Sequence, residues 1–326
     1  MIYISGTKDI HLENSAVALG KFDGLHKGHQ LLIKKLQEFK KLGYTAVMFT
    51  FDFHPFNITK KEKIELIYTS EERRHFAEMM GMDVLVEYPF NEETAHMEPE
   101  DFIRDILMKK VGAKVIVAGD DFRFGYNRRG NAQMLRDLEE AYGYQADICE
   151  KIQVEVPTFI NGRTVFVSND IGSTMIRETL RKGNVEFANE LLGRPFSVIG
   201  KVSHGRKLGR TMGMPTANLE PSMEKLLPPN GVYISKTLIE GKIYESVTNI
   251  GRNPTIAENN ARRVETYLFG YDGDLYGKLI EVELYKHQRL EMKFETIDAL
   301  KAQMEKDLMQ ARAYFQTLRD TGSEGK

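Results

Sequence analysis

At 326 residues the chain is about twice as long as a typical single domain, which predicts two domains, each with its own hydrophobic core. Its 41% hydrophobic and 28% charged residues are typical of a globular protein and exclude an intrinsically disordered one. The formal net charge of −2 excludes a strong overall field that would attract nucleic acid or an anionic membrane. We therefore expect no nucleic-acid partner, and any phosphate binding must come from local geometry.

The cysteine content and the N-terminal residues indicate the compartment. Because Cys149 is the single cysteine, neither an intrachain disulfide nor a thiolate metal cage can form. The first residues lack the basic stretch and apolar core of a signal peptide, and no apolar run approaches the roughly 18 residues that span a bilayer. These features predict a cytoplasmic protein without membrane contact.

Residues 1–185 alternate short apolar runs with amphipathic helical segments. The apolar runs have the length of buried strands, and they cover residues 16–19, 46–51, 84–87, 114–118 and 164–167. Among the helical segments, residues 27–42 place Leu36 on an apolar face and end before Gly43, and Thr69 and Glu72 have the spacing of a capping box. Alternating strands and helices predict an α/β domain with a parallel, Rossmann-like sheet joined by right-handed crossovers.

Residues 186–326 have a different pattern. After Gly193, β-branched and aromatic residues recur at period two between glycine turns, as in residues 231–235, 237–244 and 264–269. Short strands at this spacing predict a small antiparallel β-barrel. A final amphipathic helix is expected over residues 297–318, with Ala311 and Phe315 on its apolar face.

The segment Gly-Lys-Phe-Asp-Gly-Leu-His-Lys-Gly-His at residues 20–29 follows a predicted strand and opens a predicted helix. Its glycines let the backbone approach a ligand closely, and the free amides of a helix start favour phosphate. His26 and His29 lie about one helical turn apart, so both imidazoles can donate hydrogen bonds to one α-phosphate during in-line displacement. A helix start that carries two exposed histidines is the structural alternative.

A second glycine-rich segment spans residues 201–218. It lacks the G-x-x-x-x-G-K-S/T order of a P-loop, so a Walker-type site is not supported. Glycines spaced by four residues, with basic residues between them, could still wrap a polyphosphate through backbone amides and charge. A basic hairpin loop is the structural alternative.

Four segments of the first half resemble the FMN adenylyltransferase half of the bacterial bifunctional riboflavin kinase/FAD synthetases, within the nucleotidyltransferase superfamily. Residues 20–29 have the form G-x-F-D-G-x-H-x-G-H, and residues 119–125 have the form G-x-D-F-x-F-G. Residues 50–55 resemble the T-F-D-P-H-P loop, with Phe53 in place of the proline. Residues 172–177 resemble the S-S-T-x-I-R motif, with Gly172 in place of the first serine.

The resemblance implies which residues of the first half act on nucleotide. His26 and His29 would stabilise the α-phosphate, and Arg177 would hold the β- and γ-phosphates that leave as pyrophosphate. Because the attacking phosphate of FMN is already an anion, positioning and charge neutralisation suffice and no strong base is required. The remaining expected contacts are Gly20, Phe22, Asp23, Gly24, Gly28, Asp121, Phe122, Phe124, Arg128, Ser173 and Thr174.

The second half resembles the riboflavin kinase domain of the same family. Residues 201–218 are similar to its ATP-binding segment, which ends in P-T-A-N, and residues 249–255 match its N-I-G-x-x-P-T turn. The resemblance implies that Glu265 accepts the proton of the ribityl 5′-hydroxyl, and that Thr216 and Asn218 hold Mg²⁺ through oxygen atoms. The remaining expected contacts are Gly205, Arg206, Gly209, Arg210, Gly213, Pro215, Asn249 and Arg289.

The resemblance covers about residues 15–315 and implies a bifunctional transferase of flavin biosynthesis. Residues 186–326 would convert riboflavin and ATP into FMN and ADP, and residues 1–185 would convert FMN and ATP into FAD and pyrophosphate, with Mg²⁺ serving both reactions. The expected partners are these small molecules, and the expected assembly is a monomer or a weak homo-oligomer.

Two alternatives to the bifunctional enzyme stay open. One is a monofunctional FAD synthetase or riboflavin kinase whose other half is inactive. The other is a non-catalytic, flavin-binding regulator, against which Glu265 and the two histidines argue, because binding alone needs neither a base nor transition-state donors.

Overall fold

The computed structural model describes residues 1–52, 65–160, 163–204, 214–252 and 262–321, which form two compact units, Met1–Ser173 and Thr174–Lys326. Along the chain, the division between the units falls at the start of helix α7 (Ser173–Arg181). The predicted limit between the two functional domains, at residue 185, stays a prediction. Five predicted ATP contacts lie outside the described residues, namely Gly205, Arg206, Gly209, Arg210 and Gly213.

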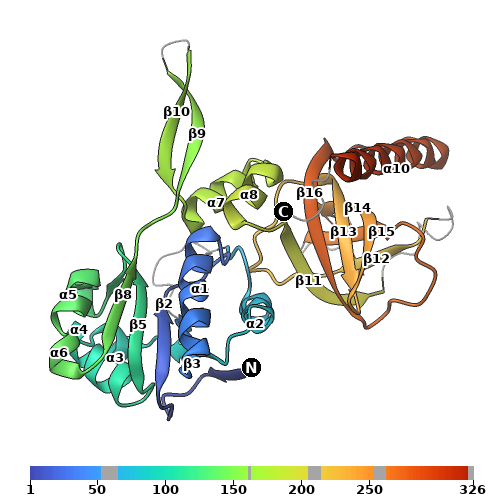
Figure 1. Ribbon diagram of the computed structural model, residues 1–326. Coiled ribbons are helices and arrows are strands. Elements are labelled where there is room, and N and C mark those ends of the chain that lie inside the picture. The colour runs from blue at the N-terminus through green and yellow to red at the C-terminus, as the bar shows by residue number, and fades with distance from the viewer. Residues whose placement is uncertain (53–64, 161–162, 205–213, 253–261, 322–326) are drawn as a thin grey trace. The chain divides into compact units, whose positions relative to one another are not determined.

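The first unit is built on a six-stranded sheet in which all pairs are parallel, which confirms the predicted α/β class (Figure 1). Its apolar runs are buried because helical segments cover both faces of such a sheet. In spatial order the strands are β1 (Ile2–Ser5), β4 (Val84–Pro89), β3 (Thr45–Asp52), β2 (Ser15–Leu19), β5 (Ala113–Gly119) and β8 (Gln145–Cys149).

Helix α1 (Lys27–Lys41) packs against strands β2 and β3 through Leu32, Ile33 and Leu36, and the chain leaves it through Gly43, whose φ is +93°. A π-helix at Phe102–Met108 packs with Val17, Leu19 and further alternate residues of the strands. Thr69 and Glu72 form the predicted capping box at the N-terminus of helix α2 (Ser70–Met79). The short elements are α3 (Glu92–Ala95), α4 (Pro99–Asp101), β6 (Arg123–Phe124), a 3₁₀ turn at Tyr126–Arg128, β7 (Gly130–Asn131), α5 (Ala132–Asp137) and α6 (Glu139–Tyr142).

The predicted strand at residues 164–167 is real, but its place in the parallel sheet was wrong. It belongs to β10 (Arg163–Asp170), which pairs antiparallel with β9 (Gln153–Ile160) in a separate two-stranded ribbon (Figure 1). Residues 161 and 162 alone separate the two strands. A parallel pairing needs a crossover of about a dozen residues or more, so this short connection permits a hairpin and no crossover.

The second unit contains a closed six-stranded barrel with antiparallel neighbours, as predicted. Helices α7 and α8 (Val185–Leu192) precede it. Around the barrel the strands are β11 (Phe196–Ser203), β12 (Thr216–Leu219), β15 (Arg262–Leu268), β14 (Lys242–Arg252), β13 (Gly231–Ile239) and β16 (Leu279–Leu290).

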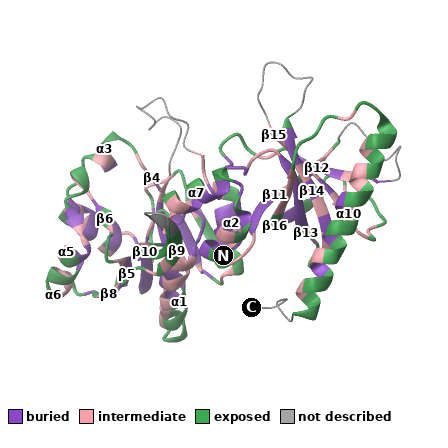
Figure 2. Cartoon of the chain, turned by 90° about the horizontal axis from the view of Figure 1, so that it is seen from above, coloured by how far each residue is buried: buried purple, intermediate pink, exposed green. Residues whose placement is uncertain are grey.

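Two kinds of packing hold the barrel. Inside it, buried hydroxyls hydrogen-bond to one another at 2.7–3.4 Å; they belong to Ser235, Thr237, Ser246, Thr248 and Thr266. Outside it, helix α10 (Ile297–Asp320) packs Ala311 and Phe315 against Ile234, which confirms the predicted terminal helix. Most other residues of α10 are exposed or partly exposed, as the green and pink of its cartoon in Figure 2 show.

Candidate active sites

A cavity of about 500 Å³ lies at the carboxyl ends of the parallel strands in the first unit. The chain runs from β2 to β3 on one side and returns to β5 on the other side of β2, so the strand order reverses at β2. Ligands of open α/β sheets bind at such a reversal, outside the carboxyl ends of the strands. Leu19, Gly20, Phe49, Phe51 and Gly119, which end these three strands, line the cavity.

The loop between β2 and α1 has an unusual backbone. Phe22 and Leu25 have φ values of +50° and +44°, and the side chains of both residues are fully buried. A left-handed backbone costs a non-glycine residue about 1–2 kcal/mol. Burying a Phe or Leu side chain stabilises by about 1.5–3 kcal/mol, which is enough to offset that cost. The loop is therefore held in a strained shape, as is common at functional sites.

His26 and His29 meet at the end of this loop. His26 is the N-cap of α1, and its ring stacks on the ring of His29 with centroids 3.8 Å apart. The Phe22 ring lies 5.2 Å from the His29 ring. His26 is 7% exposed, so the alternative of two exposed histidines at a helix start was wrong. The two imidazoles form one packed pair that lines the cavity.

Both imidazoles are neutral near pH 7. Burial lowers the pKa of His26 to about 4, although the negative charge of Asp121 acts in the opposite direction. Burial also holds the pKa of His29 well below its usual value, and the charges of His26 and Arg73 add to this effect. A neutral imidazole keeps one ring N–H, so the pair can donate hydrogen bonds to an anion without carrying positive charge.

This protonation state predicts the pH dependence of the reaction at the first cavity. We expect its kcat to stay level between about pH 6 and pH 8, because no histidine of the pair titrates near 6.5, and to fall as the pH approaches 4. The unfolded chain binds more protons than the folded chain between about pH 6.5 and 4, so the free energy of unfolding should decrease over the same fall in pH. NMR titration of the ring signals tests this, and an inflection of both kcat and the His26 signal near pH 6.5 would contradict it.

Gly28 makes room for the histidine pair, and its replacement separates activity from stability. A Cβ at Gly28 would lie 3.2 Å from Cε1 and Nδ1 of His26, which would push the ring by a few tenths of an ångström. Alanine in place of a helical glycine stabilises by about 0.5–1 kcal/mol. For Gly28→Ala we therefore expect an unchanged or higher Tm and a roughly tenfold lower kcat for adenylyl transfer, since small misplacements are costly in an active site.

A matched control for this variant lines the same cavity. A Cβ at Gly172 would meet no atom within 4 Å, and Gly172 has no left-handed φ, so Gly172→Ala should keep the native rate. Equal rates for the Gly28 and Gly172 variants would show that the histidine pair does not depend on the space at residue 28.

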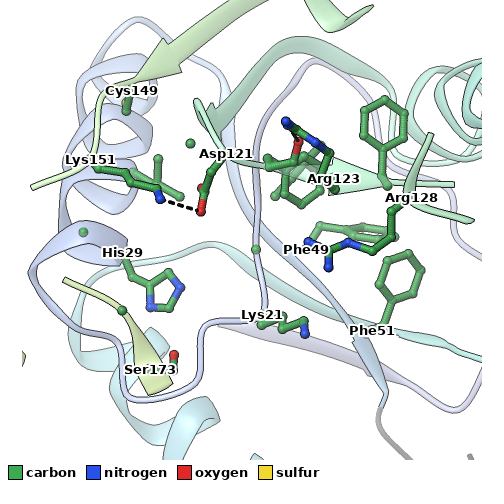
Figure 3. A pocket seen from close by; sticks show the side chains of 18 of the residues that line it. Lys21, His29, Phe49, Phe51, Asp121, Arg123, Arg128, Cys149, Lys151 and Ser173 are labelled. Atoms are coloured by element: carbon green, nitrogen blue, oxygen red, sulfur yellow. Dashed lines mark hydrogen bonds and ion pairs between the residues drawn. The ribbon is translucent and has the colours of Figure 1, made fainter. Parts of the chain in front are cut away.

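The far side of the cavity is aromatic. The ring of Phe51 lies 5.7 Å from Phe49, 5.4 Å from Phe90 and 5.9 Å from Phe102, centroid to centroid. Figure 3 shows Phe49, Phe51 and Arg128 on one side of the view and His29 and Ser173 on the other. The sequence reasoning missed these phenylalanines, although Phe49 and Phe51 stand at the end of a predicted strand, where an α/β site is expected.

The structure brings most of the residues predicted for the first site together. Those that line the cavity are Gly20, His26, Gly28, His29, Asp121, Phe122, Phe124, Arg128 and Ser173. Phe22, Asp23 and Gly24 are buried in the loop beneath and do not line it. Thr174 and Arg177 lie on α7 in the second compact unit, and the roles predicted for them stay predictions.

The sequence reasoning also missed a cation at this cavity. Lys151 Nζ lies 3.3 Å from Asp121 Oδ2 (Figure 3). It also lies 2.8 Å from Asp170 Oδ2. Hydrogen bonds to Asp170 and Asp121 raise the pKa of Lys151, so it stays protonated at neutral pH. Cys149 is buried and lines the same cavity.

The second unit aligns three predicted site residues across its barrel. Glu265 on β15 stands directly opposite Asn218 on β12 and directly opposite Asn249 on β14. Opposed residues of antiparallel strands share a face, with Cβ atoms about 4.5–5.5 Å apart. Thr266, the next residue on β15, belongs to the buried hydroxyls of the interior, so Glu265 and the two asparagines lie on the outer face.

A cavity of about 850 Å³ reaches this row at Asn218, whereas Glu265 and Asn249 are not among the residues that line it. Pro215, Thr216 and Asn218 line it, and so do the tyrosines at positions 267, 271 and 276. Asp272 and Asp274 line it as well. Asn218 is 6% exposed, and its buried Oδ1 has no hydrogen-bond partner within the described part of the chain.

Arg289 lies on β16, apart from this cavity. Its Nε and Nη2 donate to the carboxylate of Asp307 on α10 at 2.7–3.1 Å, and Gln303 Nε2 donates to the same carboxylate at 2.8 Å. Asp307 is 2% exposed, so the Arg289–Asp307 ion pair is largely buried and joins β16 to α10. The flavin or nucleotide contact predicted for Arg289 stays a prediction.

Comparison with known proteins gives one family for both units. The family model described as FAD synthetase matches residues 8–159, and the model described as riboflavin kinase matches residues 192–315. In the part of the chain that the structure describes, no helix is long and apolar enough to cross a membrane.

Full-length relatives agree with these matches. The bifunctional riboflavin kinase/FMN adenylyltransferase of Bacillus subtilis is 37% identical, with 94% of each chain covered, and that of Escherichia coli K12 is 36% identical, with 93% of each chain covered. A crystal structure of a macrolide-efflux protein from Streptococcus pneumoniae superimposes with a TM-score of 0.78 at 29% identity, covering 95% of this chain and 98% of the other. Because both family models match and the full-length relatives carry the same two activities in their names, the chain belongs to the bifunctional riboflavin kinase/FMN adenylyltransferase family.

Proposed function

We propose that this chain makes FAD from riboflavin in two ATP-dependent steps, one in each unit. The observation that carries the proposal is that each unit has its own cavity, next to a different group of candidate catalytic residues. The first cavity holds the neutral histidine pair, and the second adjoins the row of Asn218, Glu265 and Asn249.

In the first unit, a phosphate oxygen of FMN attacks the α-phosphorus of ATP, and the bond from this phosphorus to the bridging oxygen of pyrophosphate breaks. The N–H groups of His26 and His29 donate to the α-phosphate oxygens, on which negative charge increases in the transition state. Arg128 supplies positive charge at the same cavity. The phenylalanine side of the cavity suits the isoalloxazine ring, because flat aromatic surfaces stack favourably.

In the second unit, the ribityl 5′-oxygen of riboflavin attacks the γ-phosphorus of ATP, and ADP leaves. Glu265 accepts the proton of this hydroxyl, because an alcohol is a poor nucleophile at neutral pH. The two cross-strand asparagines flank Glu265 and can orient it and its substrate. The acceptor of the kinase reaction is a neutral alcohol that must lose a proton, whereas the acceptor of the adenylyltransferase reaction is a phosphate that is already an anion. A carboxylate base is therefore expected at the kinase site, and none is required at the adenylyltransferase site.

Mg²⁺ fits the donors of the second cavity. The buried Asn218 Oδ1 lacks a partner among the described residues, and Thr216 projects from the same face of β12, two residues away. Amide and hydroxyl oxygens suit a hard cation that keeps several water molecules and substrate phosphates as ligands. When bound there, Mg²⁺ would neutralise charge on the transferred phosphate.

A direct assay tests the proposal against its alternatives. Purified protein with riboflavin, ATP and Mg²⁺ should form FMN first and FAD later, separated by chromatography, and excess chelator should stop both. FMN alone would support a monofunctional kinase, FAD from supplied FMN alone would support a monofunctional synthetase, and no turnover would support a flavin-binding regulator. We further propose that the enzyme is cytoplasmic. We also propose that it is a monomer or a weak homo-oligomer, and analytical sedimentation tests this assembly state.

A further inference from the structure

We infer that Asp23 is a positioning residue for the histidine pair, acting through the protein backbone and not through contact with nucleotide. Asp23 belongs to the motif segment at residues 20–29, but its carboxylate is bonded within the fold. It is 7% exposed, and it is not among the residues that line the first cavity. The inference deepens the adenylyl transfer proposed above and rests on it for one of its two readouts.

The carboxylate of Asp23 binds a segment that is distant in the sequence. Its Oδ1 accepts hydrogen bonds from the backbone N–H of Ile67 at 2.9 Å and of Tyr68 at 3.2 Å. Both of these residues are fully buried, and the Tyr68 ring lies 4.6 Å from the ring of Phe76 on α2. The segment is therefore a firm anchor, continuous with the capped start of α2.

A second hydrogen bond holds the backbone of the same residue. Ser173 Oγ donates to the backbone carbonyl of Asp23 at 2.8 Å. Asp23 is thus fixed on one side by residues 67–68 and on the other by the end of the first unit. Its neighbours in the loop, Phe22 and Leu25, have left-handed backbones, which relax unless the surroundings hold them.

The place of Asp23 explains how it would affect chemistry. Two residues, Gly24 and Leu25, separate Asp23 from His26, the N-cap of α1, so the loop fixed by Asp23 sets where the histidine pair begins. A carboxylate that faced the phosphates of ATP would repel them. The carboxylate of Asp23 instead accepts hydrogen bonds from two backbone N–H groups, which stabilise its negative charge. The side chain therefore serves the shape of the loop.

Three variants of Asp23 and one control test this inference. For Asp23→Ala we expect kcat of adenylyl transfer from supplied FMN to fall about tenfold or more, with the KM for ATP unchanged within about twofold. Riboflavin phosphorylation should be unaffected. Asp23→Asn should recover most of the rate, because its amide oxygen can accept both N–H bonds, whereas Asp23→Glu should not, because the longer side chain displaces the carboxylate.

The control is Thr69→Ala, which removes the cap of α2 beside the anchoring segment. It should lower the Tm but keep the native kcat. A second readout is independent of turnover: in Asp23→Ala the amides of Ile67 and Tyr68 should exchange faster, and the NMR ring signals of His26 and His29 should shift. These shifts test the inference even if the native chain proves inactive in adenylyl transfer.

Four results would overturn the inference. A raised KM for ATP with unchanged kcat would place Asp23 in contact with nucleotide. An equal loss of kcat in Thr69→Ala would reduce its role to local stability. Unshifted histidine signals in Asp23→Ala would remove the link to the pair. If the alanine variant does not fold, the other two variants decide. A higher rate of adenylyl transfer for Asp23→Glu, which keeps the charge, than for Asp23→Asn, which keeps the shape, would show that the charge of residue 23 matters and its geometry does not.

Discussion

Replacing His29 by alanine is expected to lower kcat for FMN adenylylation by about 10²–10³, while riboflavin phosphorylation keeps its native rate. The loss of one preorganised donor to a transition-state oxyanion costs a factor of this size. The His29 ring also supports the ring of His26 at 3.8 Å, so its removal weakens the second donor as well. Rates measured separately with FMN and with riboflavin as substrate test both halves of this expectation.

Two further variants separate chemistry from packing in this test. His29→Asn keeps an N–H donor and should recover part of the lost rate. Leu36→Ala removes a fully buried side chain from the same helix, which costs about 2–5 kcal/mol of stability but takes no donor from the cavity. A comparable loss of both reactions in a folded His29→Ala protein would contradict two independent sites.

Glu265→Gln is expected to have the reverse effect. The amide has the shape of the carboxylate but cannot accept the hydroxyl proton, so kcat for riboflavin phosphorylation should fall by about 10²–10⁴. The KM for riboflavin should change little, because glutamine has nearly the same size and shape as glutamate and the backbone register that places residue 265 opposite Asn218 and Asn249 is unchanged. Adenylylation of supplied FMN should be unchanged.

The matched control is Glu220→Gln, which makes the same chemical change one residue after β12. Glu220 is exposed and pairs with Arg263 at 3.3 Å, and it lines neither cavity. It should therefore keep native rates in both reactions. A Glu265→Gln enzyme with an undiminished phosphorylation rate would remove Glu265 from the role of base.

The sequence predicted the fold classes of both halves because burial leaves a strong local pattern. Apolar runs such as residues 46–51 identify strands that are covered on both faces, and period-two alternation identifies the barrel. The strand at residues 164–167, now part of β10, was assigned to the wrong sheet, because an apolar run shows that a segment is a strand but not which strand it pairs with. That choice depends on the length of the connection.

The site was predicted less completely, because side-chain partners lie far apart in the sequence. The spacing of His26 and His29 indicates a shared face, but their neutral state arises from burial in the folded unit. Asp23 belongs to the motif at residues 20–29, yet the backbone amides that bind its carboxylate lie 44 and 45 residues further along the chain. Likewise, the sequence around Arg289 gives no sign that Asp307, on a separate helix, binds its guanidinium.

The most direct test of two separate phosphorus chemistries follows labelled phosphate from ATP into the flavins. With riboflavin and ATP labelled at the γ-phosphorus, FMN and FAD should both carry label, because the phosphate of FMN is retained in FAD. With ATP labelled at the α-phosphorus, FAD alone should carry label. Label from the α-position in FMN, or none from either position in any flavin, would contradict the account.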